Sequence, residues 1–76
     1  MITIYGKVGC KACDDAKKLC EDNGVNFTYL TLGSDYSVSD FYGIAPKSWR
    51  SFPMVSFNGE FKGGLKELKD YIKGLI

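Results

Sequence analysis

The sequence of 76 residues contains no histidine, no large excess of either charge and no long apolar run. Ten basic and nine acidic residues leave a net charge of +1, which gives no indication of binding to nucleic acid or to a membrane. The apolar runs span only a few residues, so no transmembrane segment is expected. Residues 1–5 lack the basic and extended apolar regions of a signal peptide. We therefore expect a single cytoplasmic domain over residues 1–76.

Cysteine is also scarce, with three in the chain. In a small chain without a secretion signal, three cysteines fit a reducing compartment better than a disulfide scaffold. Cys10 and Cys13 form a C-x-x-C pair between a strand-like run and a helical one. In a strand–helix–strand setting, this spacing is typical of thioredoxin-like redox sites. Cys20 is expected on nearly the same helix face as Cys13, as a small buried hydrophobe.

The position of the pair predicts thiol–disulfide exchange, because the thiolate is the species that attacks disulfides. An ordinary thiol of pKa about 8.5 is only about 3% ionised at pH 7, whereas a helix N-terminus and C-x-x-C spacing lower the pKa to roughly 3.5–7.5. The structural alternative is half of a zinc site. A zinc site needs four ligands, and with three cysteines and no histidine a complete set would require carboxylates or a second chain. We therefore expect no metal site.

Short β-branched or aromatic runs alternate along the chain with segments of helical periodicity. The pattern predicts strands at residues 2–5, 27–32, 54–57 and 60–62, and helices at about residues 11–23 and within residues 34–44. After Gly63-Gly64, a last helix presents one apolar face made of Leu65, Leu68, Ile72 and Leu75. Ser37 and Asp40 resemble a capping box, Asn58-Gly59 predicts a hairpin turn, and residues 45–51 are expected to form a loop or a short helical turn.

Two segments carry a family resemblance. Tyr5-Gly6-Lys7-Val8-Gly9-Cys10-Lys11-Ala12-Cys13 resembles the active-site segment of glutaredoxins, in the compact form familiar from phages and bacteria. Phe52-Pro53, a strand, Asn58-Gly59 and then Gly63-Gly64 before a terminal helix resemble their second half. The resemblance implies an α/β thioredoxin fold, in which a central four-stranded mixed sheet is flanked by three helices in the order βαβαββα. Residues 33–50 are the least typical part.

The resemblance also implies roles for individual residues. Cys10 matches the nucleophile, and Cys13 matches the resolving thiol, which attacks the mixed disulfide and releases the reduced substrate. Lys7 matches the basic residue that pairs with a glutathione carboxylate. Lys7 and Lys11 would also favour the Cys10 thiolate. The alternative for both lysines is a solvated surface charge.

The glutathione groove is expected along Phe52, Pro53, Gly63, Gly64 and Leu65. Phe52-Pro53 matches the family pair whose peptide bond is cis, which would turn the backbone of Phe52 toward the thiols for pairing with an extended substrate. The alternative is an ordinary trans proline opening an edge strand. Lys66 stands where the family has an aspartate that holds the amino end of glutathione, so its charge is reversed there.

The resemblance therefore implies a redox-active dithiol–disulfide oxidoreductase, acting in electron transport and cell redox homeostasis. We expect a monomer without a bound cofactor that is reduced by glutathione and passes electrons to disulfide-containing proteins such as ribonucleotide reductase. Two alternatives remain: a redoxin recharged by thioredoxin reductase, and a dimer bridged by an iron–sulfur cluster through Cys10 and a glutathione thiol.

Overall fold

A mixed four-stranded sheet forms the centre of the molecule, in the order β2-β1-β3-β4. The computed structural model describes residues 2–45 and 51–75, apart from the side chain of Leu75. The strands are β1 (Ile2–Gly6), β2 (Phe27–Thr31), β3 (Met54–Phe57) and β4 (Glu60–Gly63). Strand β1 runs parallel to β2 and antiparallel to β3, and β3 runs antiparallel to β4. The parallel pair and the antiparallel hairpin edge agree with the sequence prediction.

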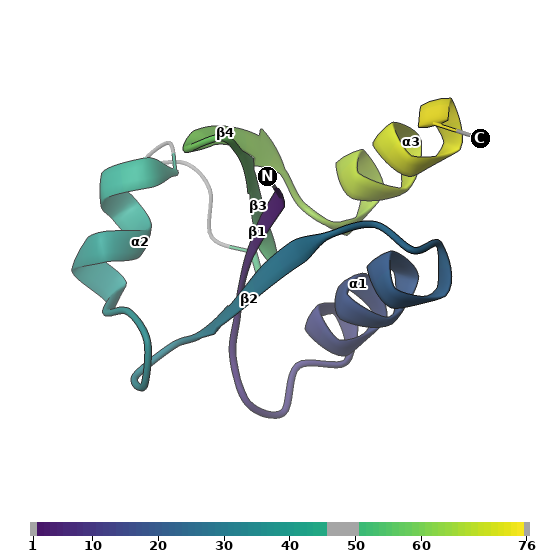
Figure 1. Ribbon diagram of the computed structural model, residues 1–76. Coiled ribbons are helices and arrows are strands. Elements are labelled where there is room, and N and C mark those ends of the chain that lie inside the picture. Colours follow the sequence, from purple (N-terminus) through teal and green to yellow (C-terminus); the bar gives the residue numbers. More distant parts are fainter. Residues whose placement is uncertain (1, 46–50, 76) are drawn as a thin grey trace.

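Three helices cover the two faces of this sheet. Helices α1 (Lys11–Asp22) and α3 (Leu65–Leu75) lie together on one face, and α2 (Val38–Ile44) lies on the other (Figure 1). This arrangement confirms the α/β thioredoxin fold with the element order βαβαββα. No helix within the described residues is long and apolar enough to cross a membrane. The segment predicted as a loop or helical turn at 45–51 lies largely outside the described residues, as does the side chain of Leu75 on the predicted apolar face.

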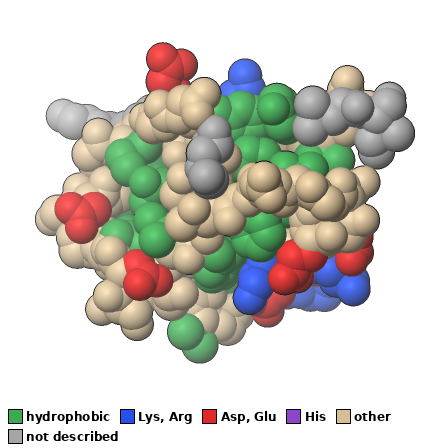
Figure 2. All heavy atoms as spheres, in the orientation of Figure 1, with side chains coloured by type: hydrophobic (Ala, Val, Ile, Leu, Met, Phe, Trp, Pro, Cys, Tyr) green, Lys and Arg blue, Asp and Glu red, His purple; other side chains and the backbone are tan. Residues whose placement is uncertain are grey.

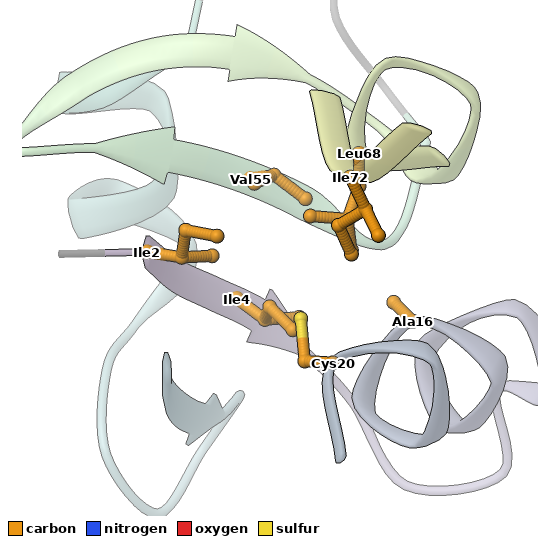
Figure 3. Close-up of a cluster of buried hydrophobic side chains, with 7 residues drawn as sticks. All are labelled: Ile2, Ile4, Ala16, Cys20, Val55, Leu68 and Ile72. Atoms are coloured by element: carbon orange, nitrogen blue, oxygen red, sulfur yellow. The ribbon is translucent and has the colours of Figure 1, made fainter. Parts of the chain in front are cut away.

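The alternation of side chains along β1 divides the core into two clusters. Ile2 and Ile4 point to the α1–α3 face, where they pack with five further buried residues shown in Figure 3: Ala16, Cys20, Val55, Leu68 and Ile72. On the α2 face, Tyr36, Phe41, Ala45 and Met54 form the second cluster, against which Tyr5 packs. Cys20 is completely buried in the first cluster, as its position two turns beyond Cys13 predicted.

Local signals in the sequence determine where several elements begin and end. Ser37 and Asp40 form the predicted capping box: the Asp40 N–H donates to Ser37 Oγ at 3.2 Å, and the Ser37 N–H donates to the Asp40 carboxylate at 3.0 Å. The predicted hairpin turn has left-handed backbone at both central residues, with φ of 52° at Asn58 and 87° at Gly59. Glycine and asparagine tolerate this conformation, which matches the twist of the flanking strands.

The predicted element ends are correct to within a few residues, and tertiary contacts explain some differences. Strand β1 extends to Gly6, which pairs with Thr31, one residue beyond the predicted end. Leu32 leaves β2 and forms an isolated bridge to Tyr36, so β2 ends one residue early. The Tyr36 hydroxyl donates to the Gly6 carbonyl at 2.8 Å, which ties the segment before α2 to the end of β1.

Candidate active site

The two paired cysteines lie at the carboxyl end of β1, where the chain turns into α1. Cys10 is the N-cap residue of α1 with an extended backbone, and Cys13 lies in the first turn. Their Cα atoms are 5.2 Å apart, and a disulfide joins their sulfur atoms. Cys10 is half-buried, whereas Cys13 has 0% of its surface exposed. A substrate therefore has access to Cys10 before Cys13.

Backbone groups of α1 provide the direct electrostatic contact to Cys10. The Cys13 N–H donates to Cys10 Sγ at 3.2 Å, and the Asp14 N–H donates to the Cys10 carbonyl at 3.1 Å. The first N–H groups of a helix have no partner within the helix, and they carry the positive end of its dipole. The same N–H that contacts Cys10 Sγ would stabilise a thiolate there.

The two lysines near Cys10 are engaged elsewhere. The exposed Lys11 ammonium pairs with the Asp15 carboxylate at 3.1 Å, one helical turn along α1. A second such pair joins Lys18 to Asp22, and charged side chains of both signs gather at the lower right of Figure 2, in the region of α1. The Lys7 ammonium lies over the ring of Phe52, 5.0 Å from its centre. Lys7 is therefore positioned between the active-site loop and the segment before β3.

The Phe52–Pro53 segment lies beside the active-site loop because of the strand register. Tyr5 pairs with Met54 in the antiparallel β1–β3 ladder, which brings the residues just before β3 next to those just after β1. The Phe52–Pro53 peptide bond is cis, as the resemblance implied. Pro53 is buried, and the half-buried Phe52 ring stacks on Phe41 of α2 with 4.8 Å between ring centres. The bulky ring is thus held by α2 on one side and by the lysine on the other.

The carboxylate of Glu67 lies against the Gly63–Gly64 segment. The Gly64 N–H donates to Glu67 Oε1 at 2.8 Å, and a side chain at Gly63 would overlap the Glu67 side chain. This hydrogen bond is the largest cause of the lowered pKa of the Glu67 carboxyl. Lys66 instead lines a cavity of about 330 Å³ between α1 and α3, together with Leu19 and Ile72.

The sequence placed the positive charge of Lys66 at the Gly63–Gly64 segment. In the structure, the negatively charged Glu67 carboxylate lies against these glycines instead. The reason is helical geometry. Residue 67 is three positions after Gly64, so its side chain folds back over the start of α3, whereas residue 66 projects to a different face. The spacing of Gly64 and Glu67 is that of a capping interaction, and this signal could have identified Glu67 from the sequence.

A second cleft lies on the β2 side of the active-site loop. Its volume is about 310 Å³, and it is lined by Lys7, Val8, Gly9, Asp14, Tyr29 and Thr31. Val8 projects from the loop with 87% of its surface exposed, two residues before Cys10. Tyr29 reaches from β2 over Gly6, where a side-chain carbon would overlap its hydroxyl and lie 3.1 Å from Cys13 Cβ. Sequence reasoning missed Tyr29, because no local pattern marks a strand residue whose side chain extends over the end of a neighbouring strand.

The described residues contain no group of three or more histidine, cysteine or acidic side chains placed to hold a metal ion. Cys20 does not join the Cys10–Cys13 pair, since it lies in the core cluster beneath β1. Burial is the main cause of the raised pKa of its thiol, with a smaller contribution from Glu21. The site consists of one pair of cysteines, in which Cys10 is half-buried and Cys13 is fully buried.

A C-x-x-C pair at the start of α1, beside a cis proline in a thioredoxin fold, defines a small thiol–disulfide redox domain. The sequence matches the glutaredoxin family over residues 2–62, and the chain belongs to this family. A hybrid peroxiredoxin, hyPrx5 of Haemophilus influenzae, is 31% identical to it over 70 residues. That match covers 92% of this chain and 28% of the relative, so this chain spans little more than a quarter of that protein.

Solved structures agree with the fold. Glutaredoxin 1 from Francisella tularensis, complexed with cacodylate, has 26% sequence identity and a TM-score of 0.76, covering 97% of this chain and 93% of that one. The buckwheat glutaredoxin–glutathione complex has 22% identity and a TM-score of 0.73, covering 96% of this chain and 69% of that one. Family membership and the Cys10–Cys13 pair together support thiol–disulfide oxidoreductase activity.

Proposed function

We propose that this chain is a dithiol–disulfide oxidoreductase that reduces protein disulfides and mixed disulfides. The observation that carries the proposal is the placement of the two sulfurs. Cys10 is half-buried and accepts a helix N–H, whereas Cys13 is sealed one turn further into α1. A two-step exchange needs this difference in access, because one thiol must attack the substrate disulfide and the other must attack only the mixed disulfide that results.

The reaction follows from this placement. The Cys10 thiolate attacks one sulfur of the substrate disulfide, and the other substrate sulfur leaves with the bonding electron pair and gains a proton. The Cys13 thiol loses its proton and attacks Cys10 Sγ of the mixed disulfide, which releases the second substrate thiol. The substrate disulfide is thus reduced by two electrons, and the Cys10–Cys13 disulfide forms.

Glutathione is the reductant we propose. The proposal is supported by the Lys7 ammonium, which lies over the Phe52 ring, and by the Gly63-Gly64 segment, which has a carboxylate against it. In the same proposal, Glu67 beside Gly63 replaces the missing aspartate as the group facing the glutathione ammonium. The buckwheat glutaredoxin, a structural neighbour, was solved as a glutathione complex, which supports this choice.

Two lysines provide a matched test of the glutathione proposal. Lys7 lies 5.0 Å from the centre of the Phe52 ring beside Cys10, and Lys62 lies 5.5 Å from the centre of the Phe57 ring near the opposite end of the sheet. An exposed ion pair contributes about 0–1 kcal/mol, so Lys7→Gln should raise the glutathione KM by up to about fivefold. Lys62→Gln should leave it unchanged. Equal effects of the two substitutions, or none from Lys7→Gln, would contradict a carboxylate contact at Lys7.

The electron source is decided by coupling disulfide reduction to NADPH oxidation. We expect turnover with glutathione and glutathione reductase, and none with thioredoxin reductase alone. The reverse result would favour the alternative of a redoxin recharged by thioredoxin reductase. The second alternative, an iron–sulfur-bridged dimer, predicts visible absorption and a doubled mass after anaerobic purification with iron and sulfide. We propose instead a colourless cytoplasmic monomer without a bound cofactor.

The protein substrate has two candidates. The family resemblance suggests ribonucleotide reductase. The 31% identity to part of a hybrid peroxiredoxin favours a peroxiredoxin, because the segment similar to this chain belongs to a protein of that name. The two are separated by adding the reduced chain, in single turnover, to the oxidised form of each protein and measuring which disulfide is reduced. Reduction of neither would limit the proposal to mixed disulfides of small thiols.

A further inference from the structure

We propose that Tyr29 is a positioning residue for the resolving thiol, donating a hydrogen bond to the Cys13 thiolate and connecting this buried sulfur to water in the cleft beside β2. The proposal rests on the proposed function and adds a specific group to its second step. It assigns Tyr29 to the Cys13 half of the reaction and predicts that the Cys10 half does not depend on it.

The strand register places the Tyr29 hydroxyl beside Cys13. Tyr29 pairs with Ile4 in the parallel β1–β2 ladder, and its ring extends along the sheet over Gly6. A side-chain carbon built at Gly6 would overlap this hydroxyl and would lie 3.1 Å from Cys13 Cβ. The tyrosine hydroxyl and the first side-chain carbon of the resolving cysteine therefore border the same small space above Gly6. The absence of a side chain at Gly6 is what allows the hydroxyl to reach it.

The resolving sulfur needs such a partner because water does not reach it. Cys13 has 0% of its surface exposed, so a thiolate formed there is not hydrated. A buried charge without a hydrogen bond is strongly disfavoured, and a donor to the charged form offsets part of that cost. Cys10 differs, because it is half-buried and accepts the Cys13 N–H. Within the described residues the Tyr29 hydroxyl makes no hydrogen bond, so it is free to turn toward the sulfur.

The surroundings keep this hydroxyl protonated and in contact with solvent. Partial burial, and to a smaller extent the nearby Asp14 carboxylate, raise the pKa of Tyr29, so it acts as a donor at neutral pH. The Lys17 ammonium lies over the ring at 5.6 Å from its centre, and Lys7 and Asp14 line the adjoining cleft of about 310 Å³. Tyr29 also lines this cleft, which is open to solvent.

In the proposed exchange, the proton of the Cys13 thiol is transferred through the Tyr29 hydroxyl. When a glutathione thiolate attacks Cys10 Sγ, the Cys10–Cys13 bond breaks and its electron pair moves to Cys13 Sγ. One proton then passes from cleft water through the Tyr29 hydroxyl, which gives up its own proton and gains another, to form the Cys13 thiol. In substrate reduction the same proton leaves before Cys13 attacks the mixed disulfide.

The test is Tyr29→Phe, which removes the hydroxyl and keeps the ring. The matched control is Tyr5→Phe, a half-buried tyrosine of β1 that packs edge-on against Tyr36 on the opposite face of the sheet. The fully reduced protein is mixed with a chromogenic aryl disulfide. The first aryl thiolate released reports attack by Cys10, and the second reports attack by Cys13 on the mixed disulfide. Both phases are followed from pH 5 to pH 9.

We expect Tyr29→Phe to slow the second phase by about threefold at pH 7, because the lost donor makes the thiolate about tenfold less populated and a Brønsted slope of about 0.5 offsets half of that on a logarithmic scale. Its first phase should match that of the unmodified protein, and Tyr5→Phe should change neither phase. An unchanged second phase and pH profile in Tyr29→Phe would overturn the proposal, as would equal slowing of both phases. Absence of a second phase in the unmodified protein would instead contradict the proposed function itself.

Discussion

The reactivity of the three thiols toward an alkylating reagent can be derived from the structure. Cys10 is half-buried and accepts an N–H at the start of α1, whereas Cys13 and Cys20 are each 0% exposed. For cysteines in general, placement at a helix N-terminus in a C-x-x-C pair lowers the pKa from about 8.5 to roughly 7, which raises the ionised fraction at pH 7 from about 3% to about 50%. The thiolate population therefore increases about sixteenfold.

A lower pKa also weakens the nucleophile, which reduces this gain. With a Brønsted slope of about 0.4–0.5, a fall of about 1.5 pKa units decreases the intrinsic reactivity about fivefold. A cysteine at such a helix start is therefore expected to react about threefold faster than an unperturbed thiol at pH 7. The larger contrast comes from access: Cys13 and Cys20 should react only when the protein opens locally, so their rates should be far below that of Cys10.

The assay is alkylation of the reduced protein at pH 7, with the modified cysteine identified by peptide mass. Cys13→Ser should leave Cys10 reactive and should trap the protein as a mixed disulfide with its substrate, whereas Cys10→Ser should abolish attack. Cys20→Ser serves as a control for general loosening of the fold. Faster alkylation of Cys13 than of Cys10 would reverse the assigned roles and refute the reasoning from burial and helix position.

Three further predictions concern the surrounding structure. Cys20→Ala should retain activity and lose at most about 1–2 kcal/mol of unfolding free energy by urea titration, because it leaves only a small cavity; inactivation would contradict a packing role. Glu67→Gln should weaken the hydrogen bond from the Gly64 N–H, and the resulting loss of thermal stability should depend on pH. The folded-state pKa of Glu67 lies below its ordinary value of 4.5. The stabilisation by the ionised carboxylate is therefore present above pH 4.5 and is lost as the pH falls below it. The melting temperatures of the unmodified protein and of Glu67→Gln should thus converge in acid. Lys66→Asp should change the glutathione KM less than Glu67→Gln does, since Lys66 lines the cavity between α1 and α3. A larger effect of Lys66→Asp would indicate that Lys66 contacts glutathione.

Much of the fold follows from short-range patterns in the sequence. The capping box at Ser37 and Asp40, the left-handed turn at Asn58-Gly59 and the two periodicities each depend on residues that are close along the chain, so they were predicted with ends correct to within a few residues. The position of the dithiol at a helix start also follows from order alone, because a strand-like run precedes the pair and a helical run follows it. These features need no knowledge of what packs against them.

Other features depend on contacts between distant segments, and only the tertiary structure decided them. The Lys7 ammonium lies over Phe52, 45 positions along the chain, because the β1–β3 register brings the two loops together. The Tyr29 hydroxyl and Cys13 Cβ border the same space above Gly6, because β2 adds parallel to β1 and Gly6 has no side chain to fill that space. A residue pattern specifies which atoms can interact, whereas the strand register and the packing of helices decide which of them meet. The sequence by itself therefore determined the chemistry of the dithiol, and the tertiary structure decided its surroundings.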